Sequence, residues 1–394
     1  VTNAADFKTQ AESGSAAVIT VSGTLTLPAK VAVKSNKTIQ GLDADSTIIG
    51  NLELGSGVSN VIIRGLNITN PAGEGITLAG ATNVFINHVT FFNGSDTLLR
   101  IAAGSDNIAV TWCEFYFSAE HTGARRATLI GASSGETKAL RVTLAHNWWS
   151  DRVDQYMPDS TFGHVHLINN YFNVGATANT QGSIARASAQ FLSERNQYTG
   201  IANPLSKTGG GLIRAIGNAY TSTTGTAADA GSDTVFFPSY AYSLLPVTEV
   251  STQVAAGAGN NAGAASTSEA FPTASISAPN STVTTGSSFT LTPTTVAGYT
   301  SYQWRLNHTD IAGATNATYN VASAQASHAG TYTVVLTNAS GASIVSSPFT
   351  LAVNVAPPPA PAPSGGGGGG GGSHSLYFLA ALASLALLRR IRRA

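Results

Sequence analysis

Short alternations of apolar and polar residues recur along the first half of the chain at a nearly constant spacing. Each segment alternates Val, Ile, Leu or Phe with single polar residues, which is the period of a β-strand with one buried face. Successive segments begin 23 to 25 residues apart, except for one step of 33 residues that leaves room for an inserted loop. The segments are NVIIRGLNIT from Asn60, NVFINHVTF from Asn83, NIAVTWCEF from Asn107, LRVTLAHNWW from Leu140, HVHLINNYF from His164, AQFLSERNQY from Ala189 and LIRAIGNAY from Leu212.

This repeat predicts an all-β fold built from stacked coils. About 24 residues are too few for two helices, but they fit one coil of a parallel β-helix with about three short strands. Stacking brings equivalent positions of successive coils into register, so we expect recurring asparagines to form an amide ladder and nearby aromatic residues to stack. The residues concerned are Asn147, Asn170, Asn196 and Asn218, with Trp148, Tyr171, Tyr198 and Tyr220.

The pattern changes after residue 271, where about seven short alternating strands follow one another. Trp304 and the later H-A-G-T-Y segment, which contains Tyr332, are typical of an immunoglobulin-like β-sandwich with a buried tryptophan and a tyrosine corner. The chain has a single cysteine, Cys113, so this domain has no disulfide.

These patterns divide the chain into five parts. Residues 1–250 form the parallel β-helix, including an aromatic segment after residue 220 that we expect to cap its open end. Residues 251–271 are a linker, 272–355 the immunoglobulin-like domain, and 356–375 a second linker rich in Pro and Gly. Residues 376–394 form a short apolar segment with an Arg-rich end, which resembles the sorting tails of bacterial surface proteins. We therefore predict export to the bacterial outer envelope or secretion, membrane contact through this tail, and prior removal of a signal peptide, which is absent from this chain.

Charge limits the partners that the protein can have. Only 10% of residues are charged, and 20 Lys and Arg balance 20 Asp and Glu. Four of the arginines lie in the last six residues, so the rest of the chain is mildly acidic, with 16 positive and 20 negative side chains. This balance argues against a nucleic-acid partner. The chain is expected to be a monomer.

Several segments of the β-helix resemble signatures of the pectate lyase and pectin lyase family, over roughly residues 1–220. They are VAVKSNKTIQG, NVIIRGLNI, NVFINHVTF, LLRIAAGSDNIAVTW, ATLIG, LRVTLAHNWW and FGHVHLINNYF. The resemblance implies a right-handed single-stranded parallel β-helix and cleavage of an acidic (uronate) polysaccharide such as pectate by β-elimination. It also implies calcium held by three acidic side chains and a basic R-x-P-x-x-R motif.

The acidic positions of that family are only partly retained. Glu74 and Asp96 match the first two calcium ligands, but the third position is Arg100, which repels a cation. Calcium is therefore possible but doubtful. Arg100 could replace it by neutralising a substrate carboxylate, or it could simply form an ion pair with Asp96 or Glu74.

The basic motif departs further from the family pattern. Tyr156 and Thr161 stand where the motif has its two arginines, and Pro158 is retained. Tyr156 is a candidate base, although tyrosine ordinarily titrates near pH 10 and needs a nearby cation. Arg126, which matches a substrate-binding lysine of the family, could supply that cation together with Arg125.

Three alternatives stay open at this point. Arg152, displaced by one extra residue, could be the base, whereas Tyr156 could be a residue that stacks on a sugar or packs in the fold. His164 and His166 alternate on one strand, and we interpret them as ladder residues rather than metal ligands. The chain as a whole is either a lyase with a degenerate motif or a non-catalytic glycan-binding or adhesive scaffold on the cell surface.

Overall fold

The computed structural model describes residues 1–131, 140–175, 181–225, 233–261 and 272–355. The predicted linker 356–375 and the tail 376–394 lie outside these ranges. No helix among the described residues is long and apolar enough to cross a membrane.

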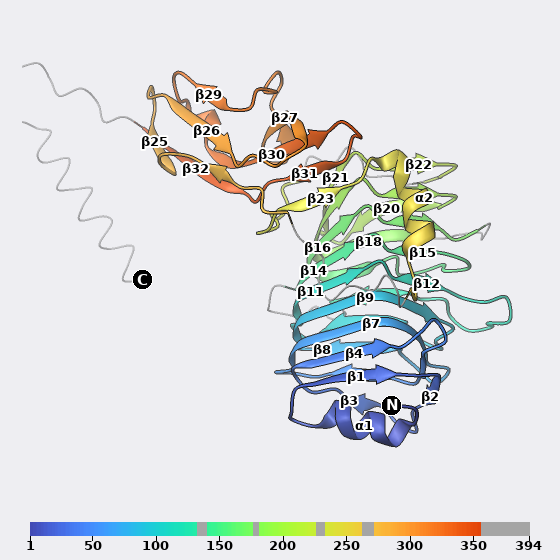
Figure 1. The fold of residues 1–394 in the computed structure, drawn as a ribbon. Coiled ribbons are helices and arrows are strands. Elements are labelled where there is room, and N and C mark those ends of the chain that lie inside the picture. Colours follow the sequence, from blue (N-terminus) through green and yellow to red (C-terminus); the bar gives the residue numbers. More distant parts are fainter. Residues whose placement is uncertain (132–139, 176–180, 226–232, 262–271, 356–394) are drawn as a thin grey trace, which may run out of the picture. The chain divides into compact units, whose positions relative to one another are not determined.

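The N-terminal part is a parallel β-helix, as the repeat predicted (Figure 1). Its strands form three walls, in each of which a strand pairs in parallel with the equivalent strand of the next coil. The side wall contains β1 (Ala17–Val21), β4 (Lys37–Gly41), β7 (Ser59–Thr69), β9 (Thr82–Phe92), β11 (Asp106–Thr111), β14 (Arg141–Ala145), β16 (Asp159–Ile168), β18 (Gln181–Glu194) and β21 (Leu212–Ile216).

The other two walls use shorter strands and parts of the long ones. The back wall contains β2 (Thr24–Thr26), β5 (Thr47–Ile49), β12 (Glu114–Tyr116), β15 (Trp148–Trp149), β17 (Tyr171–Asn173), β19 (Gln197–Thr199) and β22 (Ala219–Thr221), with the ends of β7 and β9. The site wall contains β3 (Val31–Ala32), β6 (Leu52–Leu54), β8 (Ile76–Ala79), β10 (Leu99–Ala102), β13 (Thr128–Ile130) and β20 (Asn203–Thr208), with the starts of β16 and β18.

The alternating pattern places every second side chain inside the coils. These Val, Ile, Leu and Phe residues form one continuous core along the β-helix. Helix α1 (Ala4–Glu12) closes the N-terminal end by burying Phe7 and Ala11 against this core. Burial of apolar surface between coils therefore holds the solenoid together, because each coil alone could not bury its own inner face.

The predicted amide ladder is present. The side-chain oxygen of Asn170 accepts hydrogen bonds from the backbone N–H and the side-chain amide of Asn147, at 2.9 and 3.1 Å. Asn196 binds Asn170 in the same way, and Asn218 binds Asn196. Aromatic stacking is also present, but its main run is Phe91, Phe115, Trp149, Phe172, Tyr198 and Tyr220, so only two of the four residues that we expected, Tyr198 and Tyr220, belong to it. Trp148 and Tyr171 stack on each other instead, at 6.0 Å.

The described residues 233–241 of the aromatic segment lie along the side wall rather than over the end of the β-helix, where we expected a cap. Phe236 stacks on His164 of β16, with ring centroids 4.7 Å apart, and Tyr240 binds the hydroxyl of Thr143 on β14. Strand β23 (Tyr242–Leu244) then pairs with the following β-sandwich, and helix α2 (Val247–Gly257) covers part of the region in which we expected a linker. We call residues 233–241 the strap.

The last described region contains a β-sandwich with its own core around Trp304 and Tyr332, both fully buried. The Tyr332 hydroxyl donates to the backbone carbonyl of His328 at 2.7 Å, which is the predicted tyrosine corner. One sheet has the order β23, β31 (Ser343–Val345), β30 (Gly330–Asn338), β27 (Tyr299–Leu306) and β28 (Thr309–Asp310). Two further strands belong to this sheet: β32 (Phe349–Asn354) pairs with β30, and β25 (Thr282–Thr284) pairs with β32. The other contains β24 (Ile276–Ser277), β26 (Phe289–Pro293) and β29 (Tyr319–Val321), and a 3₁₀ turn, Ala326–His328, precedes β30.

Candidate active site

The site wall places polar side chains from successive coils in one outward-facing column. Parallel pairing aligns Thr77 with Arg100, Arg100 with Leu129, and Leu129 with Asp159. Thr77, Arg100 and Leu129 alternate with buried residues and are partly exposed, whereas Asp159 is itself buried. The sequence therefore brings candidate residues that are far apart in the chain onto one face of the β-helix.

Both acidic residues expected to bind calcium already face a guanidinium group. Arg100 Nη1 lies 3.1 Å from Glu74 Oε1, which is one of the two ion pairs that we considered for Arg100. Arg126 Nη1 lies 3.5 Å from Asp96 Oδ1. Calcium requires six to eight oxygen ligands and no competing cation, so these residues do not fit a calcium site. The described residues also contain no group of three or more His, Cys, Asp or Glu side chains arranged to hold a metal ion.

Arg125 and Arg126 point to different partners. Arg125 binds one carboxylate oxygen of Asp154 through Nε and Nη2, at 3.0 and 2.7 Å. Arg126 instead places its Cζ atom 5.6 Å from the centre of the Tyr156 ring. At this distance a guanidinium attracts an aromatic face. The structure thus brings Arg126 and Tyr156 together, whereas Arg125 is occupied by Asp154.

A hollow of about 430 Å³ lies beside Tyr156 on the site wall. Its lining residues are Leu129, Gln155, Tyr156, Asp159, Thr161, Gln181, Ile184 and Arg186. The hollow therefore includes both residues that replace the arginines of the family motif. Tyr156 has a φ of 63°, a left-handed conformation that is uncommon for residues other than glycine and is often found at functional sites.

Arg186 is a member of this hollow that the sequence analysis missed. Its guanidinium binds the buried carboxylate of Asp159 through Nε, at 2.7 and 2.9 Å, and through Nη2, at 2.8 Å. The hydrogen bond to Asp159 raises the pKa of Arg186, and the charges of Asp159 and Tyr156 raise it further. Burial has the opposite effect but is outweighed. A signal was present in the sequence, because Arg186 is a single charge among small residues on the coil that follows the motif.

Arg152 is not among the residues that line this hollow. Its side chain is exposed, and its backbone N–H donates to the carbonyl of Val174 at 3.1 Å. The pKa of Glu120 is lowered by hydrogen bonds from its own backbone and from Ser118, and also by the charge of Arg152, so these two charges lie near each other.

Charges in and around the hollow balance one another. Arg100, Arg125, Arg126 and Arg186 face Glu74, Asp154, Asp96 and Asp159 respectively. Arg100, Arg126 and Arg186 are each 39% exposed, so their guanidinium groups can still be reached from solvent. An anionic ligand would have to share each of these arginines with a carboxylate of the protein.

The fold and the site define a parallel β-helix protein with a polar hollow on one wall, lined by Tyr156, Asp159 and Arg186 among others. Residues 1–267 match the family model described as pectate lyase. The chain therefore belongs to the pectate lyase family, as the sequence motifs indicated.

Relatives of known sequence support this assignment. The chain is 31% identical over 271 residues to the probable pectate lyase A of Neosartorya fischeri, which is 65% of this chain and 80% of that protein. It is also 31% identical over 185 residues to the pectate trisaccharide-lyase of Thermotoga maritima, covering 42% of this chain and 48% of the relative. The chain thus spans about half the length of that second relative.

Solved structures show the same fold. A thermostable pectate lyase, PL 47, superposes with a TM-score of 0.52 at 19% identity, over 66% of this chain and 91% of that chain. The cedar pollen allergen jun a 1 superposes with a TM-score of 0.55 at 20% identity, over 64% and 82%.

Proposed function

We propose that this protein is a polysaccharide lyase that cleaves a uronate polysaccharide, such as pectate, by β-elimination. The observation that carries the proposal is the placement of Tyr156 in the hollow, with the guanidinium of Arg126 over its ring and Arg186 on the next coil. Family membership supports the substrate class.

In the proposed reaction, the Tyr156 phenolate takes the proton from the carbon next to the uronate carboxyl group. The electron pair of that C–H bond forms the new double bond as the glycosidic C–O bond breaks. The same proton then passes from Tyr156 to the departing glycosidic oxygen. Arg126 binds the carboxylate and stabilises the negative charge that develops on it, and Arg100 is placed to assist from the neighbouring coil.

The test is absorbance of the unsaturated uronate product with polygalacturonate, pectin and alginate, each with and without a chelator. We expect activity that survives the chelator, because Arg100 stands at the third calcium position. Tyr156→Phe should lower the rate by about 10² to 10⁴-fold, the usual contribution of a general base. Arg152→Ala is the matched control and should retain activity. Absence of product with all three substrates would refute the lyase.

A second function is favoured by the charge balance of the hollow. Four arginines are already paired with four carboxylates, so the site wall has no unpaired cation among these residues for a polyanion. A non-catalytic scaffold would bind a glycan without releasing an unsaturated product. Binding of oligogalacturonate that is unchanged in Tyr156→Phe and accompanied by no absorbance would establish this alternative.

We also propose that the protein acts outside the bacterial cell, as a monomer held at the envelope by its C-terminal tail. The support is the order of the last segments, in which an apolar run precedes four arginines. Cell fractionation of the full chain and of a variant truncated after residue 355 tests this. Equal release of both into the medium would contradict a role for the tail.

A further inference from the structure

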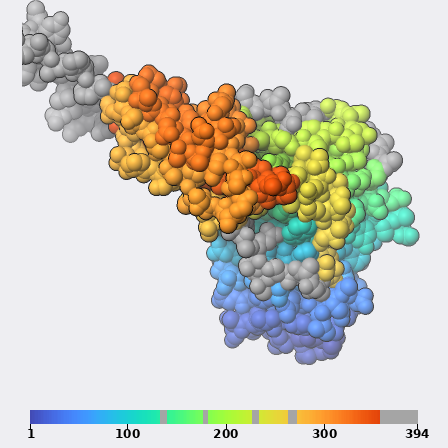
Figure 2. Space-filling model, turned by 45° about the horizontal axis from the view of Figure 1, so that its top comes forward, coloured from blue at the N-terminus to red at the C-terminus, as the bar shows by residue number. Residues whose placement is uncertain are grey.

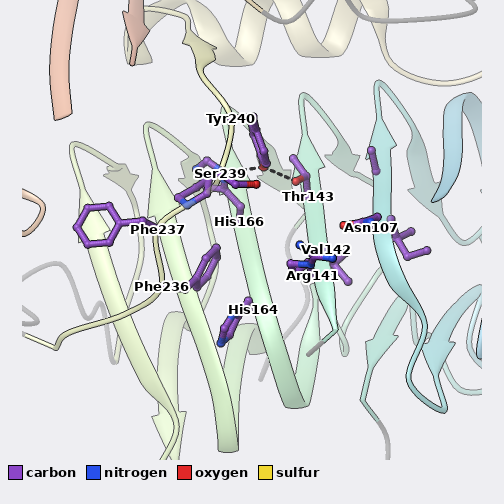
Figure 3. Close-up of a pocket in the computed structure, with 13 residues that line it drawn as sticks. Asn107, Arg141, Val142, Thr143, His164, His166, Phe236, Phe237, Ser239 and Tyr240 are labelled. Carbon is purple, nitrogen blue, oxygen red and sulfur yellow. Dashed lines mark hydrogen bonds between the residues drawn. The ribbon is translucent and has the colours of Figure 1, made fainter. Parts of the chain in front are cut away.

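A second hollow, of about 310 Å³, lies on the side wall of the β-helix (Figure 3). The Tyr156 hollow lies on a different wall, the site wall. Strands β11, β14 and β16 form its floor, and the strap runs along one edge. Figure 2 shows the surface of the β-helix passing from blue to green, so segments that follow one another in the sequence lie next to each other on it.

The floor is open on the β11 side because the outward residue there, Ala109, is small. Parallel pairing aligns Phe85, Ala109 and Thr143 as neighbours in one outward-facing column. The methyl group of Ala109 fills far less space than the ring of Phe85 on the preceding coil. The space above Ala109 is therefore the part of the wall that a ligand can enter.

Polar groups with unused hydrogen-bonding capacity stand at the edge of this hollow. Arg141 binds Asp106 through Nε, at 2.9 and 3.2 Å, and through Nη2, at 2.6 Å. Its Nη1 has no partner within the ranges that the structure describes. Asn107 donates to the side-chain oxygen of Asn83 at 3.1 Å, which leaves its own side-chain oxygen as an acceptor.

The hollow favours a ligand without charge. Arg141 is neutralised by Asp106, and Arg141 is 52% exposed, so a ligand can still reach it. Burial, and then the positive charge of Arg141, lower the pKa of His164, so this imidazole is neutral at neutral pH. The hollow therefore offers Arg141 Nη1 as a donor and the side-chain oxygen of Asn107 as an acceptor, together with the apolar side chains of Ala109 and Phe236.

The column that contains Ala109, and the row of asparagines beside it, continue along the side wall toward the N-terminus. The outward column runs through Val18, Thr38, Ile62, Phe85 and Ala109, one residue per coil, and Val18 is 66% exposed. Beside it runs a row of asparagines, in which Asn60 donates to Asn36 at 2.8 Å.

A third hollow, of about 500 Å³, lies at the N-terminal end of this column. An apolar stripe beside a row of amides thus repeats at the spacing of the coils, about 4.8 Å. A polysaccharide chain offers the matching surface, because each sugar ring presents a C–H face and a row of hydroxyl groups.

We propose that the side wall binds a neutral polysaccharide chain, with one sugar ring in the hollow above Ala109 and its hydroxyl groups on Arg141 and Asn107. The site is separate from the Tyr156 hollow, so it does not depend on the proposed lyase activity. It would hold the protein on a neutral glycan while the site wall faces an acidic one.

Calorimetry and saturation-transfer NMR with the full chain test this. The probes are neutral tetrasaccharides of galactose, arabinose, xylose and glucose, together with tetragalacturonate. We expect at least one neutral probe to bind with an affinity that does not change between low and high salt. Ala109→Leu fills the hollow and should weaken binding at least tenfold, and Asn107→Ala should weaken it less.

Two controls separate the possible results. Ala32→Leu makes the same exchange at an outward position of the site wall and should leave binding unchanged, and so should Tyr156→Phe. Equal melting temperatures show that the variants fold. The proposal is overturned if no neutral probe binds, if only tetragalacturonate binds, or if Ala109→Leu binds like the wild type. If Tyr156→Phe loses lyase activity but binds the neutral probe as the wild type does, the result supports two independent sites.

Discussion

Glu194 is a buried carboxylate on β18, and replacing it by glutamine should make the protein less stable near neutral pH. Its side chain is 1% exposed and accepts hydrogen bonds from His166 Nε2, at 3.1 Å, and from the hydroxyl of Tyr242. Arg305 Nη1 of the sandwich lies 3.5 Å from its other oxygen. The carboxylate thus joins the β-helix, β23 and the sandwich.

The size of the effect follows from the pKa of Glu194. Burial by itself raises this pKa, but the hydrogen bond from His166, the charges of His166 and Arg305, and the Tyr242 hydroxyl outweigh burial and lower it from 4.5 to about 2. A pKa unit corresponds to about 1.4 kcal/mol, so the ionised carboxylate contributes about 3 kcal/mol to the free energy of unfolding. Because the folded pKa is the lower one, this contribution is present above pH 4.5 and is lost as the pH falls toward 2.

Urea unfolding of the wild type and of Glu194→Gln, measured across this pH range, checks the reasoning. We expect the variant to be about 3 kcal/mol less stable at pH 6, and the difference to shrink toward pH 2. Glu120→Gln, at an exposed carboxylate, is the control and should change little because water screens its charge. Parallel stability curves for the wild type and Glu194→Gln would refute the assigned pKa and the network.

Three further predictions concern the site wall, the ladder and the sandwich. Arg100→Asp removes the cation beside Glu74 and adds a carboxylate to the site wall, so calorimetry should detect tighter calcium binding than in the wild type; identical titrations would show that the carboxylates do not converge. Asn170→Ala leaves buried ladder donors unpaired and should lower the free energy of unfolding by at least about 2 kcal/mol, measured by urea unfolding. Tyr332→Phe removes one hydrogen bond and should cost about 1 kcal/mol in thermal unfolding; an unchanged melting temperature would argue against the tyrosine corner.

The spacing of the repeats was enough to predict the architecture of the β-helix. A residue such as Asn170 recurs at the same point of each coil, and parallel stacking converts that recurrence into direct contact. The sandwich was also predictable from local sequence, because Trp304 and Tyr332 occur in the pattern of short alternating strands that is typical of such a domain. Both side chains are buried in its core. Local periodicity determines these features, so no knowledge of distant contacts was required.

The ionic contacts of the site were only partly predictable. The family motifs located Arg126 and Tyr156, and one of two suggested partners for Arg100 is the observed one. The partners of Asp159 and Asp154 were not foreseen. They depend on the direction in which the long arginine side chains of a neighbouring coil point across the wall.

The sequence by itself determined the stacked coils and the asparagine ladder, since alternation and a nearly constant repeat bring equivalent positions together. It did not determine which of two adjacent aromatic residues, such as Trp148 and Trp149, joins the main stack. The tertiary structure alone decided that Arg186 enters the Tyr156 hollow and that the strap lies along the side wall. These contacts join segments whose relative position is fixed by packing rather than by periodicity. The physical reason is that a repeat specifies neighbours one coil apart, whereas a segment outside the repeat finds its place only by the surface it can bury.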